Sequence, residues 1–363
     1  MNKNLKIAII FCTRPEAIKI IPVIRELQSK KIKVSIIVTN QHQEMLSQVL
    51  ELFKIKPDHR LNIMRKNQSI FDVMAVGLKK LKPILEVEKP DLVLVQGDTM
   101  TTLVGALAAY FLKIPVGHVE AGLRTHNKFS PFPEEMNRQL VSRLADFNFA
   151  PTRKASANLL REGILKNRIF ITGNTGIDAL LSISNSFENL FLKKLILITA
   201  HRRESFGRPL KSICEAILAI SKKRDDVEIV FQVHKNPAVS NTVFKILGGK
   251  DKIMLTPPME YEFFVSMMKS SYLILTDSGG IQEEASVLGK PVLVLRNHTE
   301  RMESVKAGVS KLIGTSKVRI VKEVERLLDD KKAYGKMARK LNLYGDGKAS
   351  QRIVKIIERK MCL

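Results

Sequence analysis

The sequence predicts an α/β protein made of two doubly wound parallel sheets that face a central cleft. Short, continuously apolar runs alternate with longer amphipathic stretches along the chain, a pattern typical of parallel strands buried between helices. The length of 363 residues exceeds that of one ordinary hydrophobic core and fits two domains of middling size. Polar residues gather directly after the apolar runs, where doubly wound sheets bind their ligands.

Twelve strands are predicted, because each apolar run stops at small or polar residues. In the first half they are expected at residues 6–11, 33–39, 92–96, 116–119, 147–150 and 169–171. Amphipathic stretches between them predict helices, for example at 16–30, 43–53, 69–88 and 101–112. The second half repeats the rhythm, with strands expected at 195–199, 228–233, 253–255, 272–275, 291–295 and 312–313. Small residues at 172–176 and a polar stretch at 182–189 predict the hinge.

The composition is that of a globular protein, with 45% hydrophobic and 26% charged residues. The sequence shows neither a long apolar run nor an N-terminal signal pattern. Cys12, Cys214 and Cys362 fit neither a disulfide framework nor a metal site, so a reducing cytoplasm is expected. The net charge of +24 can attract nucleic acid, but the basic residues are dispersed and Trp is absent. We therefore expect no nucleic-acid or membrane partner; a nucleic-acid role would require salt-sensitive retention on DNA.

Charged residues follow several predicted strands in the first half of the chain. Arg14 and Lys19 come after the first strand, at the start of a helix. Asp98 and Glu120 each follow a strand, and Glu134 begins a helix after two prolines. Taken singly, each also fits a helix cap or a surface charge. Carboxylates that converge from separate loops are unfavourable unless cations or a ligand offset them, so together they indicate acid–base chemistry.

Histidines follow two predicted strands in the second half. His201 and Arg202 come directly after the apolar run Leu-Ile-Leu-Ile-Thr-Ala, beside further polar residues, which favours a functional role. His234 follows the next strand, where an ordinary loop residue is an equally good interpretation.

The most informative stretch is Asp-Ser-Gly-Gly-Ile-Gln-Glu-Glu, beginning at residue 277. It predicts a strand, a tight turn and a helix whose first N–H groups are uncovered at Ser278, Gly279 and Gly280. The positive end of the helix dipole lies there, which favours a diphosphate. Glu284, one turn further, is placed to bind a sugar hydroxyl, and Arg301 is a candidate clamp for the pyrophosphate.

No motif requires a metal or a redox cofactor, and we expect neither. The sequence has no Gly-rich loop ending in Lys-Ser/Thr, no His-Glu-x-x-His, and no Gly-x-Gly-x-x-Gly turn after the first strand. A nicotinamide-dependent enzyme is therefore not expected.

Taken in order, these motifs closely resemble those of the non-hydrolysing UDP-N-acetylglucosamine 2-epimerases, over essentially the whole chain. The resemblance implies a glycosyltransferase-B-like fold of two Rossmann-like domains, with a terminal helix near 350–360 packed on the first domain. The expected domains are residues 1–173 with 349–363, carrying most acid–base residues, and residues 174–348, binding UDP. The motifs are Thr-Arg-Pro-Glu-Ala-Ile-Lys from residue 13, Gly-Asp-Thr from 97, the Glu120 segment, residues 130–135, His-Arg-Arg-Glu from 201 and the turn from 277.

The resemblance also implies an activity, a partner and site residues. Such enzymes interconvert UDP-GlcNAc and UDP-ManNAc as cytoplasmic homodimers that supply cell-surface polysaccharide synthesis. The implied acid–base residues are Asp98, Glu120, Glu134 and His201. Phe264 matches a position near the uracil, and Met259 stands where a Gln often contacts the nucleotide. The full expected substrate-binding set is Arg14, Lys19, His234, Met259, Phe264, Ser278, Gly279, Gly280, Glu284 and Arg301.

The chemistry agrees with this assignment. C2–H of the sugar is not activated by a carbonyl, so direct deprotonation is too slow. In the gluco sugar, that hydrogen is antiperiplanar to the axial UDP group, which makes anti elimination to 2-acetamidoglucal accessible. Re-addition of UDP, with a proton on the opposite C2 face, gives the epimer. No cofactor is needed because nothing is oxidised overall.

Bacterial members of the family can bind a second UDP-GlcNAc as an activator. The expected allosteric positions here are Gln41, Glu44, Asn67 and Arg202. Glu44 and Asn67 stand where Gln and Arg are typical, so the loss of a cation predicts weakened or absent activation.

Three alternatives stay open. A hydrolysing relative would release ManNAc and UDP, although Thr99 after Asp98 and the intact His201 segment speak against it. A relative acting on a UDP-diacetamido-uronate sugar usually has Ala-Arg-Pro-Gln in place of Thr-Arg-Pro-Glu. A glycosyltransferase would share the fold but would require an acceptor.

Overall fold

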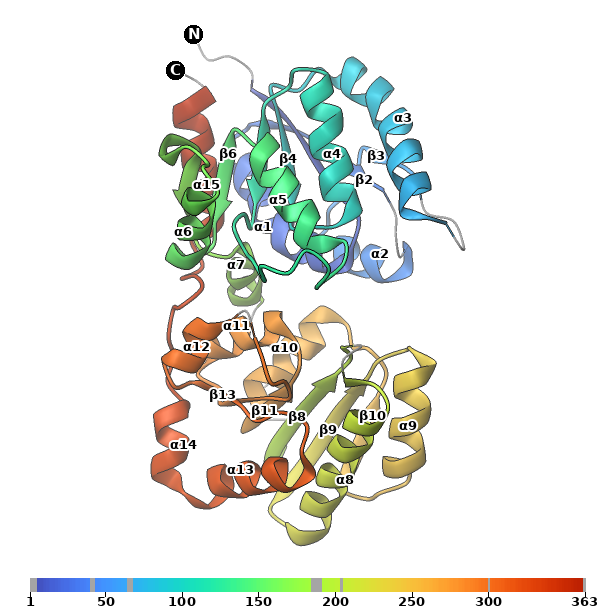
Figure 1. The fold of residues 1–363 in the computed structure, drawn as a ribbon, viewed down its shortest axis with the longest axis vertical. Coiled ribbons are helices and arrows are strands. Elements are labelled where there is room, and N and C mark those ends of the chain that lie inside the picture. Colours follow the sequence, from blue (N-terminus) through green and yellow to red (C-terminus); the bar gives the residue numbers. More distant parts are fainter. Residues whose placement is uncertain are drawn as a thin grey trace. The chain divides into compact units, whose positions relative to one another are not determined.

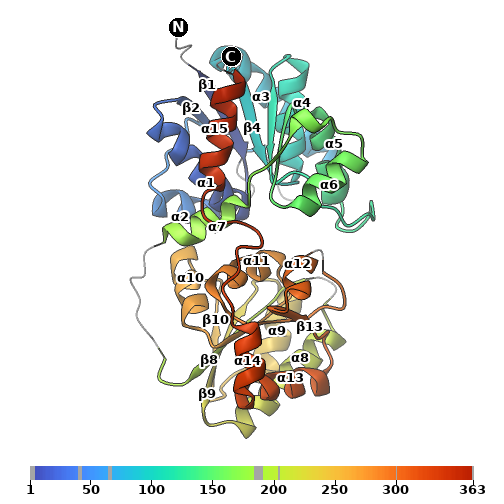
Figure 2. The same ribbon diagram turned by 90° about the vertical axis from the view of Figure 1, so that its left-hand side faces the viewer.

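The chain divides into two compact units in the computed structural model (Figures 1 and 2). The structure describes residues 5–39, 43–63, 68–183, 191–202, 205–299 and 301–361, with the side chains of 43–45 outside that description. The first unit comprises Met1–Ser182 and Tyr344–Leu363, and the second comprises Ile183–Leu343. Both are built on parallel sheets, so the predicted fold class of two doubly wound α/β domains is confirmed.

The first unit contains, within the described residues, a seven-stranded sheet in the order β3-β2-β1-β4-β5-β6-β7. Six of its strands lie where apolar runs predicted them. The two-residue strand β3 was not predicted, because His59 and Arg60 form no apolar run and pair only with the end of β2. The strands are β1 (Lys6–Phe11), β2 (Lys33–Val38), β3 (His59–Arg60), β4 (Leu92–Gln96), β5 (Val116–Val119), β6 (Phe147–Ala150) and β7 (Ile169–Ile171).

Helices of the first unit form two sets, one in which α3, α4 and α5 pack side by side and one in which α1 packs with α2, α7 and α15. Several begin at a capping residue, as at Thr13, whose side chain and that of Glu16 form a capping box. The helices are α1 (Arg14–Ser29), α2 (Gln43–Leu52), α3 (Ile70–Glu88), α4 (Met100–Phe111), α5 (Glu134–Leu144), α6 (Arg153–Arg161), α7 (Thr175–Ser182) and α15 (Ala349–Met361), with a 3₁₀ turn at Lys166–Arg168.

The second unit has a six-stranded sheet, counted over its described residues, in the order β10-β9-β8-β11-β12-β13. Its strands are β8 (Lys194–Ala200), β9 (Val227–Val233), β10 (Ile253–Thr256), β11 (Leu273–Thr276), β12 (Val292–Val294) and β13 (Ser310–Leu312). The last lies slightly earlier than the predicted 312–313. The helices are α8 (Arg208–Lys223), α9 (Pro237–Leu247), α10 (Tyr261–Ser270), α11 (Gly279–Leu288), α12 (Met302–Lys306), α13 (Lys317–Asp329) and α14 (Lys331–Met337).

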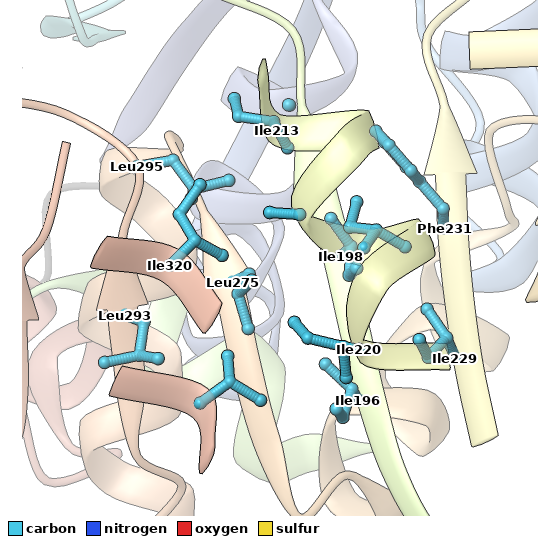
Figure 3. Close-up of a cluster of buried hydrophobic side chains, with 14 of the residues drawn as sticks. Ile196, Ile198, Ile213, Ile220, Ile229, Phe231, Leu275, Leu293, Leu295 and Ile320 are labelled. Atoms are coloured by element: carbon cyan, nitrogen blue, oxygen red, sulfur yellow. The ribbon is translucent and has the colours of Figure 1, made fainter. Parts of the chain in front are cut away.

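One buried cluster of the second unit packs between its sheet and helices that include α8 and α13 (Figure 3). Ile196 and Ile198 of β8 pack in one buried cluster with Ile213 and Ile220 of α8 and Ile320 of α13. Burial of such branched side chains stabilises the fold by roughly 1.5–3 kcal/mol each. The polar loops at the strand ends are thus attached to a closely packed core.

The C-terminal helix α15 packs on the first unit, against α1 and α7, as the resemblance implied. Asp178 of α7 is buried, and its Oδ1 accepts hydrogen bonds from the N–H and the hydroxyl of Ser350. Its Oδ2 accepts from the N–H of Ala349. Helix α7 therefore belongs to the first unit, whereas the sequence-based boundary at residue 173 assigned it to the second domain. The predicted domain boundary lies one helix too early, because the Gly and Thr residues before α7 have the composition of a linker.

None of the described helices is both long and apolar enough to cross a membrane.

Candidate active site

The first sheet reverses its strand order between β1 and β4, and doubly wound proteins bind ligands outside the carboxyl ends of such strands. Ile10 of β1 pairs with Val95 of β4, so the chain leaves both strands at the same level. Arg14 then opens α1, and Asp98 lies in the loop before α4. The register therefore explains why charged segments distant in sequence meet at one edge of the sheet.

Glu120 joins this edge because Gln96 of β4 pairs with Val119 of β5. Its Oε1 accepts a hydrogen bond from Lys19 Nζ at 2.5 Å, and its Oε2 accepts one from Gln96 Nε2 at 2.7 Å. The Glu120 side chain is only 9% exposed. Its φ of 69° lies in the left-handed region, which is uncommon for a residue with a side chain and recurs at functional sites.

Asp98 lies close to the other two predicted carboxylates. The Arg138 guanidinium lies 2.8 Å from its Oδ2. The pKa of Asp98 is raised to about 6, chiefly by burial and also by the charges of Glu120 and Glu134, against the opposing effect of Arg138. A carboxyl group with this pKa exchanges its proton close to neutral pH, which suits acid–base work.

Glu134, at the start of α5, differs from its neighbour Glu135 in its hydrogen bonding. Its Oε2 is buried and has no hydrogen-bond partner in the part of the chain that the structure describes. Glu135 is fully buried, and it accepts from the N–H groups of Thr125 and His126, which ties the preceding loop to the helix. An unsatisfied carboxylate oxygen is costly unless a proton or a ligand reaches it, so Glu134 is the member of the pair suited to chemistry.

A buried carboxylate, Glu16, fixes the loops around the first cluster. Its Oε2 accepts from the N–H groups of Cys12 and Thr13, and its Oε1 accepts from the hydroxyls of Thr99 and Thr102. With every oxygen occupied by local donors, Glu16 serves the structure and joins the β1 loop to the β4 loop.

His118, which follows Gly117 in β5, has a similar supporting role. Its Nε2–H donates to the Gly97 carbonyl at 2.7 Å, and its Nδ1 accepts from Ser142 Oγ at 3.3 Å. Burial lowers the pKa of His118 to about 4, so the ring is neutral near pH 7. It fixes the residue that precedes Asp98.

The second unit has its own switch point, between β8 and β11. Thr199 pairs with Thr276, so His201 leaves β8 beside the turn that follows β11. Ala200 pairs with Val233, which places His201 beside His234. The two imidazole rings stack with their centroids 6.0 Å apart. Both predicted histidines thus lie at the ligand-binding edge of this sheet.

The turn after β11 forms the predicted helix start, but the N–H of Ser278 is not uncovered as predicted, because it donates to Thr276 Oγ1 at 3.0 Å. Ser278 is the N-cap of α11, and its side chain makes no capping hydrogen bond. The first N–H groups of the helix are therefore not capped by that hydroxyl, and they carry the positive end of the dipole. A Cβ on Gly280 would meet no atom of the described residues within 4 Å, so this side of the turn is open to a ligand.

Arg301 covers the other side of the same turn. A Cβ on Gly279 would lie 3.0 Å from Arg301 Cζ, so the glycine allows the guanidinium to pack against the backbone. Arg301 Nε donates to Glu283 Oε1 at 2.7 Å, and both side chains are almost buried. The pair places a cation beside the helix N-terminus, an arrangement that favours an anionic ligand.

The remaining predicted binding residues lie on α10, on α11 and before them. Glu284 is half-buried on α11, one turn after Gly280. Phe264 and Met259 are each 7% exposed. Met259 lines a pocket of about 480 Å³ together with Thr256, Pro257, Glu260, Glu262 and Phe263.

The predicted allosteric positions are only partly covered by the structure. Gln41 and Asn67 lie outside the described residues, as does the side chain of Glu44. The N–H of Arg202 donates to Asp277 Oδ2 at 2.9 Å.

Sequence reasoning missed four residues that position the predicted ones: Gln96, Arg138, Asp277 and Glu283. Asp277 and Glu283 lie inside the motif that begins at residue 277, next to Ser278 and Glu284. For Arg138 the usable signal was its spacing of four residues from Glu134, which puts both on one face of α5. For Asp277, the signal was an acidic residue immediately before a glycine-rich helix start.

The comparison with known proteins agrees with this geometry. A family model described as UDP-N-acetylglucosamine 2-epimerase matches residues 25–358. The chain belongs to the UDP-N-acetylglucosamine 2-epimerase family. A Yersinia pestis protein named UDP-N-acetylglucosamine 2-epimerase is 50% identical, with 98% of each chain covered. The predicted family is thereby confirmed.

Solved structures of family members have the same fold over the whole chain. The Neisseria meningitidis UDP-GlcNAc 2-epimerase bound to UDP-GlcNAc matches with a TM-score of 0.92 and 45% identity, covering 98% of this chain and 100% of that one. The Methanocaldococcus jannaschii enzyme in complex with UDP-GlcNAc and UDP matches with a TM-score of 0.85 and 39% identity, over 98% and 100% of the two chains.

Proposed function

We propose that this member of the family interconverts UDP-GlcNAc and UDP-ManNAc by anti elimination of UDP and its re-addition, without hydrolysis. The observation that carries the proposal is the meeting of Asp98, Glu120 and Glu134 at one switch point, with Lys19 bound to Glu120. Relatives that bind UDP-GlcNAc and UDP support the choice of substrate.

The first unit supplies the acid–base chemistry. When the C1–O bond to UDP breaks, positive charge develops at C1, and the ionised carboxylates stabilise it electrostatically. One carboxylate accepts the C2 proton, so that the C1–C2 double bond of 2-acetamidoglucal forms as UDP leaves with the bonding electron pair. In the return step, a carboxylic acid delivers a proton to the opposite C2 face while UDP adds back to C1. Atoms and charge balance without an oxidant or a reductant.

The second unit holds the leaving group. The uncovered start of α11 and the Arg301 side chain provide donors for the diphosphate, and Glu284 provides an acceptor for a sugar hydroxyl. His201, which lies beside this turn, is the candidate for proton exchange at the diphosphate. Met259 and Phe264 are assigned to the uracil end of the nucleotide.

The domain roles, the partner chain and the location are proposed with it. The first unit serves as the acid–base domain and the second as the UDP-binding domain. The enzyme is expected to work as a homodimer in the cytoplasm, as its resemblance to the family implies.

Incubation of the protein with UDP-GlcNAc alone in heavy water tests the reaction. Proton NMR should show UDP-ManNAc appearing with deuterium at C2, because the removed proton exchanges with solvent before its return. Free ManNAc in place of UDP-ManNAc would instead identify a hydrolysing enzyme. Absence of turnover without an acceptor would favour a glycosyltransferase.

Allosteric activation is proposed to be weak or absent, because Glu44 and Asn67 stand where Gln and Arg are typical, and the positive charge of that Arg is lost. Initial rates with UDP-ManNAc should follow a hyperbola. A sigmoidal dependence of the rate on UDP-ManNAc concentration, which becomes hyperbolic when a trace of UDP-GlcNAc is added, would contradict this.

A further inference from the structure

Asp277 connects two loops at the edge of the second sheet. It lies between β11 and the N-cap of α11, and it is fully buried. Its Oδ2 accepts three hydrogen bonds, from the N–H groups of His201 and Arg202 at 2.9 Å each and from Ser205 Oγ at 3.2 Å. A single carboxylate oxygen therefore holds the segment that begins with His201 against the turn that begins with Ser278.

The second oxygen of Asp277 lies near the ring of His201. Oδ1 is 3.3 Å from His201 Nδ1, within ion-pair distance, and it is buried and accepts no regular hydrogen bond from the described residues. A carboxylate only accepts hydrogen bonds, so this geometry favours the proton on Nδ1 and leaves the lone pair on Nε2. The His201 side chain is 39% exposed, so the rest of the ring is reachable from solvent.

The neighbouring histidine has the opposite tautomer. His234 Nδ1 accepts a hydrogen bond from the N–H of Asn236 at 3.1 Å, which leaves the proton of the neutral ring on Nε2. The stacked pair thus presents a proton acceptor on His201 and a proton donor on His234. The two tautomers differ because Nδ1 faces a carboxylate oxygen in His201 and a backbone N–H group in His234.

We propose that Asp277 is a positioning residue that fixes His201 in its Nδ1–H tautomer and joins the His201 segment to the phosphate-binding turn. The inference rests on the proposed function for its kinetic consequence, since His201 is assigned to proton exchange at the leaving diphosphate. Departing UDP gains a negative charge, so the imidazolium form of His201 donates its Nε2 proton to the terminal phosphate. When UDP adds back to C1, the unprotonated Nε2, with Nδ1–H held by Asp277, takes that proton up again.

Asp277 opposes the other groups that act on the pKa of His201. Burial lowers the pKa of His201, Asp277 raises it, and Arg202, His234 and Arg296 lower it. Loss of the Asp277 charge would leave only groups that disfavour the imidazolium. The pKa of His201 in Asp277→Asn should consequently fall further.

Nitrogen NMR of the full-length protein, labelled with ¹⁵N-histidine, measures the tautomer directly and requires no substrate. The His201 signals are assigned by their loss in His201→Asn. Wild-type protein should show the Nδ1–H form, and Asp277→Asn should show the Nε2–H form, because the amide NH₂ then donates to Nδ1. A wild-type Nε2–H ring, or an unchanged tautomer in Asp277→Asn, overturns the proposal.

Kinetics provide the second measurement. Asp277→Asn should lower kcat on the order of 10²- to 10⁴-fold, as expected for a wrong tautomer, while the Kd for UDP stays within about threefold. Ser205→Ala is the matched control, since it removes a hydrogen bond to Oδ2 and leaves the Nδ1 contact intact; it should keep nearly full kcat. Equal losses in the two variants would indicate a purely structural role.

The two proposals fail in different ways. If wild-type protein does not epimerise UDP-GlcNAc, the proposed function is wrong, but the tautomer result still decides the role of Asp277. If Asp277→Asn does not fold, the wild-type tautomer and Asp277→Glu, which should restore the Nδ1–H form, decide it.

Discussion

At the scale of single residues, three carboxylates share one edge of a sheet with few cations to offset them. Lys19 binds Glu120 and Arg138 binds Asp98, while one oxygen of Glu134 has no partner among the described residues. Such crowding is unfavourable for three ionised groups. Burial, together with this crowding, raises the pKa of Asp98 to about 6.

This pKa predicts the pH dependence of the reaction. Asp98 holds its proton below its pKa of about 6 and loses it above, so kcat/KM should show an inflection there. Arg138→Gln removes the cation that lowers this pKa, so the inflection should move to higher pH, whereas Arg138→Lys keeps the charge and should move it less. The pH profile of kcat/KM for UDP-GlcNAc measures this. An inflection that stays in place in Arg138→Gln would show that it belongs to another group.

The carboxylates can also be tested one at a time. Asp98→Asn, Glu120→Gln and Glu134→Gln keep the shapes of the side chains but remove proton transfer and charge, so each should lower kcat by about 10²- to 10⁴-fold. UDP binding, measured by calorimetry, should change little because the diphosphate is assigned to the second unit. Wild-type turnover in all three variants would remove the acid–base assignment.

At the scale of an element, α11 illustrates how a helix start is kept free for a ligand. Gly279 lets Arg301 pack against the backbone, and Gly280 leaves the opposite side open. Ser278 could cap the helix with its side chain but does not. The donors at the helix start and the buried Arg301–Glu283 pair are thus arranged before any ligand arrives, which reduces the cost of binding.

Gly279→Ala tests this arrangement. The added Cβ would lie 3.0 Å from Arg301 Cζ, so the guanidinium must move and the affinity for UDP should fall about tenfold, equivalent to about 1.4 kcal/mol. Gly335→Ala in α14 is the matched control. It adds a Cβ in open space, so it should leave UDP affinity unchanged and raise stability by about 0.5–1 kcal/mol. UDP binding by Gly279→Ala as tight as that of the control would contradict the role of the glycine.

At the scale of the whole molecule, the chain returns to its first unit through α15. The buried carboxylate of Asp178 accepts the first N–H groups of this helix, from Ala349 and Ser350. Arg352 of the same helix bonds the Thr172 carbonyl and Asp346. A segment at the end of the sequence is thereby held to the helix that precedes the second unit.

Asp178→Ala should therefore destabilise the protein by roughly 1–3 kcal/mol, since it removes a helix cap and leaves buried N–H groups without an acceptor. The stability of Asp178→Asn, which keeps one acceptor oxygen, should lie between that of Asp178→Ala and that of the wild type. Urea unfolding followed by circular dichroism measures the change. The exposed Asp251 provides a control, because Asp251→Ala should unfold as the wild type does. Identical midpoints for Asp178→Ala and Asp251→Ala would contradict the capping role.

The sequence by itself determined the strands, their order of appearance and the polar residues at their ends. It did so because burial on both faces requires continuous apolar runs, and because only small residues open the turn before α11. The motifs around Asp98, Glu120 and the turn at Ser278 were readable for the same reason, since each follows such a run directly.

Only the tertiary structure decided which side chains meet. The pairing of Asp98 with Arg138, of Glu283 with Arg301 and of Asp277 with His201 depends on sheet register and helix packing, which no local pattern encodes. The same holds for the short strand β3 and for the place of α7 in the first unit. Local sequence chooses each element through burial and backbone preference, whereas contacts between distant residues form only when whole elements pack together.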